Sequence, residues 1–82
     1  MNYKKYKITF YDPTGDSGWH TAEELEEFQP EECVMEAWVY HKGKKFVLTF
    51  AAYSKNKNSG EITFADVNAL PRSCIIKMEK IK

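Results

Sequence analysis

Apolar and polar residues alternate strictly near the start of the chain. Residues 5–10 read KYKITF, so Tyr6, Ile8 and Phe10 share one face. A period of two is typical of a strand with one face in water, and we predict a first strand over residues 3–11. Residues 12–18 then read DPTGDSG. This density of turn-forming residues predicts a loop that leaves the sheet.

A short helix is predicted after this loop. Thr21 followed three residues later by Glu24 matches a capping box, in which each residue hydrogen-bonds the backbone N–H of the other. Leu25 and Phe28 lie at a spacing of three, so they fall on one face of the helix and are expected to join the core. Pro30 ends the helix after about two turns.

The rest of the chain has the pattern of further strands. Apolar, β-branched and aromatic residues gather in four segments: 33–40, 45–53, 61–68 and 74–81. The first two flank a Gly-containing turn at 41–44 and are predicted to form a hairpin. The LPRS sequence at 70–73 predicts one tight turn before the last strand.

Five short strands in 82 residues must protect their edges, and closure into a barrel is the usual solution. The strand order and the NALPRSCI stretch at 68–75 resemble SH3-like and Sm-like small barrels. We therefore predict a mainly β fold: one domain over residues 1–82, a five-stranded antiparallel barrel with one short helix between strands 1 and 2. Its expected core is Tyr6, Ile8, Phe10, Leu25, Phe28, Met35, Val39, Leu48, Phe50, Ile62, Phe64, Leu70, Ile76 and Met78.

A second resemblance covers nearly the whole chain. DSGWH at 16–20, the acidic helix, the aromatic hairpin and LPRSCII at 70–76 resemble a group of short, uncharacterised proteins of phages and mobile elements. Such proteins often have Gly before the hairpin Trp, whereas this chain has Ala37 before Trp38. The resemblance implies a phage-related setting and an accessory role.

Charge is divided along the chain although the net charge is zero. Nine acidic residues and no Lys or Arg lie between Asp12 and Glu36, whereas all 12 Lys and Arg lie outside this segment with three acidic residues. Blocks of one sign attract partners of the opposite sign. The acidic block coincides with the predicted loop and helix.

The composition of the chain indicates its cellular location. Apolar runs are short, and the Lys-rich start lacks the apolar stretch of a signal peptide, so we expect a cytoplasmic protein that does not enter a membrane. Cys33 and Cys74 are then expected to be free thiols packed as small apolar groups.

No catalytic or cofactor motif is present. His20 and His41 are the only imidazoles, and neither has the spacing of a nucleophile and base arrangement. Close Cys or His pairs of the zinc type, EF-hand spacing and phosphate loops are also missing. We expect no enzyme activity, no cofactor and no metal.

Two surfaces are candidates for binding. Trp19, His20 and Tyr11 could line a groove for an extended peptide, with Glu23, Glu24 and Glu27 of the acidic helix as one wall. The alternative is structural, with Trp19 anchoring the start of the helix or closing one end of the barrel. The second surface consists of lysines interleaved with aromatic or amide residues, which suit phosphates and stacked bases: Lys4, Lys5, Lys42, Lys44, Lys45, Lys55 and Lys57. Lysines on turns and edge strands also block aggregation.

These observations predict a small non-enzymatic binding module. We expect a phage-type accessory protein that engages a host protein or sequesters a small ligand, with inhibition of a host defence as one form. The alternative is an Sm-like nucleic-acid-binding protein that uses the lysine-rich turns. A homo-oligomer is compatible with either function.

Overall fold

The computed structural model describes residues 2–13 and 15–82, so Thr14 of the predicted loop lies outside the described residues. Within these ranges the protein is mainly β, with five antiparallel strands in one sheet and one short α-helix. The elements in chain order are β1 (Lys4–Asp12), α1 (Ala22–Glu26), β2 (Glu31–Lys42), β3 (Phe46–Lys55), β4 (Ile62–Pro71), the 3₁₀ turn η1 (Arg72–Cys74) and β5 (Ile75–Lys80).

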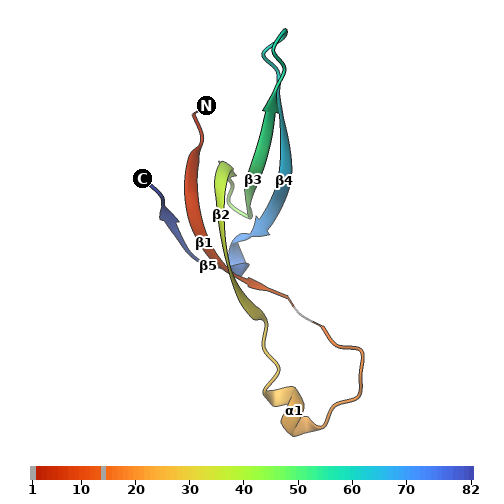
Figure 1. Cartoon of the computed structure of the whole chain (residues 1–82). Helices are drawn as coiled ribbons and strands as arrows, with labels where there is room; N and C mark the ends of the chain where they lie inside the picture. The colour runs from red at the N-terminus through yellow and green to blue at the C-terminus, as the bar shows by residue number, and fades with distance from the viewer. Residues whose placement is uncertain (1, 14) are drawn as a thin grey trace.

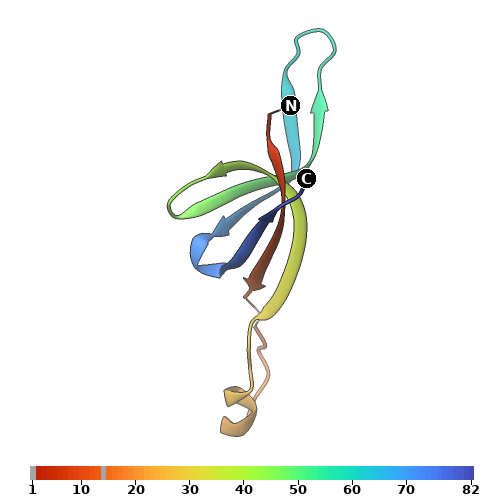
Figure 2. The same cartoon turned by 90° about the vertical axis from the view of Figure 1, so that its left-hand side faces the viewer.

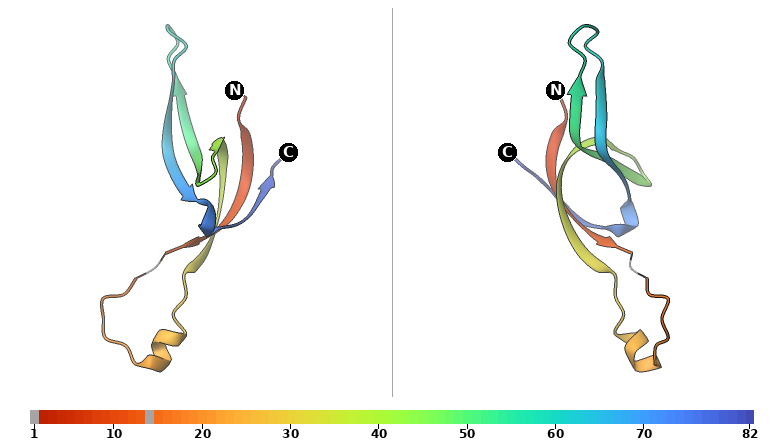
Figure 3. Two further views of the ribbon diagram at one scale, coloured as in Figure 1. Left: turned by 180° about the vertical axis from the view of Figure 1, so that it is seen from behind. Right: turned by 45° about the vertical axis from the view of Figure 1, so that its right-hand side comes forward.

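The sheet is open, with the strand order β4-β3-β2-β1-β5 (Figure 1). In the described residues, β4 and β5 form the two edges and do not pair with each other, so the predicted closed barrel is not observed. β4 pairs with β3 as far as Lys55 and Ile62, out along a hairpin that projects from the sheet. β5 is only six residues long, and it pairs with β1 on the other side. The two edges are joined through η1 at one end, as the right-hand view of Figure 3 shows.

The main core lies on one face of the sheet. Ile8, Val39, Val47 and Leu70 are buried together. Half-buried apolar side chains from β1, β2 and the C-terminal region pack against them: Tyr6, Phe10, Met35, Ile75 and Met78. The alternating pattern of β1 is therefore confirmed, because Tyr6, Ile8 and Phe10 all contribute to this face.

A second cluster consists of aromatic rings around Phe50, which is 0% exposed. Phe50 stacks on Trp38 at 5.5 Å between ring centroids and meets Phe64 edge-on at 4.7 Å. Tyr3 and Tyr53 contact it edge-on at 5.4 and 6.4 Å. Aromatic pairs in such geometries stabilise a fold beyond the area that they bury.

The predicted core is wrong at four residues, because Leu25, Phe28, Leu48 and Ile76 are exposed. Leu25 lies on α1, which has no buried residue, and Phe28 lies just beyond the end of the helix. Leu48 on β3 and Ile76 on β5 are 38% and 41% exposed. Four residues outside the expected set are buried: Thr9, Ala37, Val47 and Thr49.

The fourth strand is longer than predicted. β4 ends at Pro71 instead of residue 68, and the following turn shifts to Arg72–Cys74. Pro71 pairs with Phe46, and Arg72 donates its backbone N–H to the Lys45 carbonyl at 2.9 Å. A proline is tolerated here because β4 is an edge strand, where a missing N–H costs no ladder hydrogen bond.

The molecule is elongated. Its radius of gyration is 16.9 Å and its extents are 59 × 25 × 22 Å, whereas a compact chain of this length has a radius of gyration of about 12 Å. Figures 1 and 2 show the reason, because α1 and the tip of the β3–β4 hairpin lie at opposite ends of the molecule. No helix in the described ranges is long and apolar enough to cross a membrane.

Candidate binding surfaces

The segment 13–30 between β1 and β2 forms a projecting arm. β1 and β2 pair as far as Asp12 and Glu31, so the arm begins and ends at one point of the sheet. Every described residue of the arm is exposed, and α1 lies at its far end (Figure 1). The arm therefore presents its side chains to solvent instead of adding them to the core.

Local hydrogen bonds stabilise the arm. The predicted capping box is confirmed: the Glu24 N–H donates to the Thr21 hydroxyl at 3.2 Å, and the Thr21 N–H donates to the Glu24 carboxylate at 3.5 Å. Hydrogen bonds from the side chain and backbone of Thr21, and then from His20, hold the pKa of Glu24 below its usual value. Before the helix, the Gly18 N–H donates to the Asp16 carboxylate at 2.8 Å.

His20 connects the loop of the arm to its helix. Its ring nitrogens lie 3.3 Å from the Asp16 carboxylate and 3.5 Å from that of Glu24. Its ring also lies 6.2 Å from the ring of Phe28 beyond the helix. The predicted candidate His20 thus has an organising position within the arm.

Trp19 is 101% exposed. The interpretation that it anchors the helix or closes a barrel end is wrong, because its side chain is not covered by the sheet or the helix. The predicted groove of Trp19, His20 and Tyr11 stays a prediction. Tyr11 lies at the base of the arm, where it lines a hollow of about 400 Å³ with Phe28, Pro30 and Cys74, whereas Trp19 does not line that hollow.

The acidic candidates lie on the same arm as Trp19. Glu23, Glu24 and Glu27 are all exposed, and Glu24 is engaged in capping. No basic residue lies in the last turn of α1. The arm therefore combines an exposed indole with uncompensated negative charge.

The candidate lysines do not form one continuous surface. Lys4 and Lys5 are on β1, Lys42, Lys44 and Lys45 are at the β2–β3 turn, and Lys55 and Lys57 are at the β3–β4 tip. Figure 2 shows these two turns pointing in different directions.

Two of these lysines contact aromatic rings. The Lys5 ammonium lies 5.1 Å from the Trp38 ring centroid. The Lys42 ammonium lies 4.3 Å from the Tyr6 ring centroid and donates to its hydroxyl at 2.8 Å. This hydrogen bond is the main reason that the pKa of Tyr6 is lowered.

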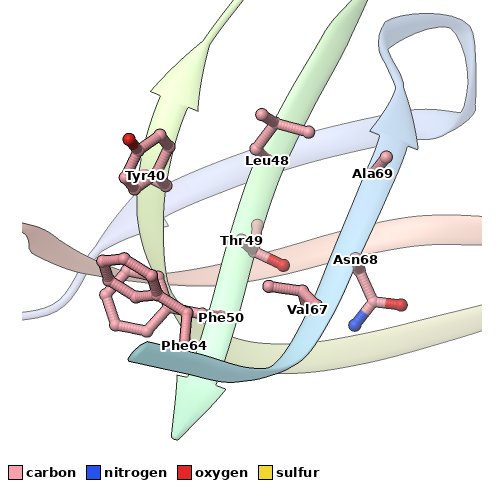
Figure 4. A pocket seen from close by; sticks show the side chains of 8 residues that line it. All are labelled: Tyr40, Leu48, Thr49, Phe50, Phe64, Val67, Asn68 and Ala69. Atoms are coloured by element: carbon pink, nitrogen blue, oxygen red, sulfur yellow. The ribbon is translucent and has the colours of Figure 1, made fainter. Parts of the chain in front are cut away.

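An apolar groove lies over β2, β3 and β4, and we call it the β3–β4 groove (Figure 4). Its volume is about 460 Å³, and none of its lining residues carries a charge: Tyr40, Leu48, Thr49, Phe50, Phe64, Val67, Asn68 and Ala69. The Thr49 hydroxyl is buried and has no hydrogen-bond partner among the described residues. This groove is not visible in the sequence, because the pattern of Leu48, Phe50 and Phe64 is also that of the core of a closed barrel.

Cys33 and Cys74 are free, half-buried thiols. Partial desolvation, with the carboxylates of Glu31 and Asp12, raises the pKa of Cys33. In the part of the chain that the structure describes, no three His, Cys, Asp or Glu residues are grouped so as to hold a metal ion.

Comparisons with known protein families, curated proteins and solved structures give no match to this chain. The described residues define a mainly β protein with an open antiparallel sheet and a projecting acidic arm.

Proposed function

We propose that the protein is a non-enzymatic binding module whose arm engages a partner protein. The observation that carries this proposal is Trp19, which is fully exposed on the arm, beside a helix that has no buried residue. Large exposed apolar side chains cost free energy in water, and Trp is among the residues that contribute most to protein interfaces. Trp19 is therefore the proposed anchor.

The arm is partly organised before binding. The capping box fixes the start of α1, and His20 links Asp16 to Glu24. A segment that is already ordered loses less conformational entropy when it docks. Leu25 and Phe28 are exposed on the same arm and extend the apolar contact beyond Trp19.

The charge of the arm indicates what kind of surface the partner presents. Asp16, Glu23, Glu26 and Glu27 are exposed, and the arm contains no Lys or Arg. We therefore expect a basic surface with an apolar pocket on the partner, since complementary potentials accelerate association and favour the correct partner. A phage-type accessory protein that binds a host protein in the cytoplasm fits this description, with the bent sheet as an SH3-like or Sm-like scaffold.

Affinity capture from cells of the native host, followed by mass spectrometry, tests the proposal. The Trp19→Ala variant is expected to lose the captured protein. Val34→Ala is the matched control, because Val34 is also exposed but lies on β2. Recovery of the same protein by wild type and Trp19→Ala would refute the arm as the binding element.

Binding to single-stranded nucleic acid is the second candidate. Lys5 lies over the Trp38 ring, and the rings of Tyr3 and Tyr40 stack nearby at 5.3 Å. Lysine beside stacked aromatic rings is a common arrangement in such proteins. Retention of mixed-sequence single strands at low salt, lost steeply as salt rises, would support this function, whereas no retention at low salt would exclude it.

A further inference from the structure

The β3–β4 groove has the character of an interface centre. Its eight lining residues include three aromatic rings and no charged group. Tyr40, Leu48 and Val67 are exposed there, and Phe46 is exposed beside them on β3. Depletion of charge with enrichment of aromatic residues is the signal that distinguishes the centre of an interface from ordinary surface.

The sheet edge beside this groove is poorly protected. β4 has ten residues, no Lys or Arg and a single charge, Asp66, whereas the other edge, β5, has Lys77, Glu79 and Lys80 among its six residues. Asp66 has a positive φ of 51° and lies where pairing with β3 is interrupted. Lysines are a usual means of preventing strand addition, and β4 lacks them.

The exposed area is larger than a compact monomer of this size would show. The accessible surface is 6734 Å², compared with about 5,100 Å² expected for a folded protein of 9.6 kDa. A stable protein–protein interface buries about 800 Å² on each partner. The excess over the compact value is about 1,600 Å², and the exposed arm contributes to it.

From these observations we infer that the β3–β4 groove and the β4 edge bind a second copy of this chain across a two-fold axis. A two-fold interface brings a surface against itself, so it requires a patch that does not repel its own copy. The uncharged groove meets this condition, whereas the acidic arm and the lysine-rich turns do not. Antiparallel pairing of β4 with β4 is compatible with a two-fold axis, pairs the outer backbone groups and places the exposed Val67 of each copy on adjoining strands.

The test is the mass of the protein in solution, measured by light scattering during size-exclusion chromatography and by sedimentation. The wild-type protein is expected at twice the chain mass of 9.6 kDa. Val67→Lys places a charge on the patch and is expected to produce the monomer mass. Val34→Lys is the matched control, because Val34 is 57% exposed and Val67 is 65% exposed, both on strands. Far-ultraviolet circular dichroism shows whether both variants keep their sheet.

Several outcomes would overturn this inference. One is a wild-type monomer at all concentrations, including a monomer whose groove takes up a small ligand. Equal effects of Val67→Lys and Val34→Lys would also contradict it. A dimer that dissociates in concentrated NaCl but tolerates Val67→Lys would indicate contact between arm and basic turns instead, because apolar contacts are not weakened by salt screening.

The inference is separable from the proposed function. Trp19→Ala is expected to remain a dimer while it loses the captured protein, and Val67→Lys is expected to retain that protein as a monomer. Loss of both properties in Val67→Lys would mean that the groove is not an independent surface, and this result would contradict the inference.

Discussion

Phe50 and Trp19 are both large aromatic residues, but they have opposite environments. Phe50 is 0% exposed on β3, where rings from β2, β4 and the N-terminal segment surround it. Trp19 is 101% exposed on the arm, where a capping box stabilises the start of the neighbouring helix. The comparison shows that the sheet carries the tertiary stability of this protein, and that the apolar residues of the arm are available for another task.

Removal of one aromatic ring from the sheet and one from the arm gives the largest expected difference in unfolding free energy. Phe50→Ala leaves a cavity among four contacting rings and is expected to cost about 3–5 kcal/mol of unfolding free energy. Trp19→Ala is expected to change it by less than about 0.5 kcal/mol, because an exposed side chain loses little burial on truncation. Urea denaturation followed by circular dichroism measures both values, and similar losses would break the distinction between sheet and arm.

Removal of the helix cap acts on the arm alone. Thr21→Ala is expected to destabilise α1 by about 1 kcal/mol and to leave the urea midpoint of the sheet unchanged. Amide hydrogen exchange in α1 measures the local effect. A shift of the global midpoint would show that the arm contributes to the stability of the sheet.

The stabilisation of α1 by the Thr21–Glu24 cap is expected to depend on pH. Thr21 and His20 hold the pKa of Glu24 below its ordinary 4.5. Because the pKa of Glu24 is lowered on folding, ionised Glu24 stabilises α1 above pH 4.5. This stabilisation is lost as the pH falls through the folded-state pKa of Glu24. In an NMR titration, Thr21→Ala is expected to raise the pKa of Glu24, and an unchanged midpoint would contradict the cap as its cause.

Replacement of the whole arm is expected to leave the sheet folded. Asp12 and Glu31 are paired, so an Asn-Gly turn could join β1 directly to β2 in place of residues 13–30. We expect the unfolding free energy of the sheet not to fall, because every described residue of the arm is exposed and a shorter loop loses less entropy on closure. Failure of this variant to fold would show that the sheet needs the arm.

The smallest expected effect lies on the sheet surface. Lys42→Met removes the hydrogen bond that lowers the pKa of Tyr6, and it is expected to raise that pKa toward 10.0. Titration of the Tyr6 ring by NMR measures the change, with Lys45→Met as the control. An equal shift in both variants would indicate a general charge effect.

The elements that depend on neighbouring residues could be predicted from the sequence. The alternation around Ile8, the hairpin turn at Gly43 and the cap at Thr21 are local patterns, and the structure has all three. The bounds of β4 were wrong because Pro71 is an acceptable residue only when its strand is an edge, and the position of a strand in a sheet is not a local property.

The candidate binding surfaces could be predicted only in part, because they depend on contacts between residues far apart in the sequence. The acidic composition of the arm and the presence of Trp19 are visible in the sequence, but the exposure of Trp19 depends on whether the arm packs on the sheet. The β3–β4 groove requires residues from three strands. Leu48 is as apolar as a core residue, but its side chain is 38% exposed, whereas Phe50 two residues along the same strand is fully covered by aromatic rings.

The sequence by itself determined the strand and helix types, the capped start of α1 and the separation of charge, because these depend on periodicity and on contacts a few residues apart. Only the tertiary structure decided that the sheet stays open, that the acidic segment projects as an arm and that an uncharged groove lies beside β4. These features depend on which faces and edges find a partner in space. In a single chain several faces and edges have no partner, and both proposals concern these uncovered surfaces.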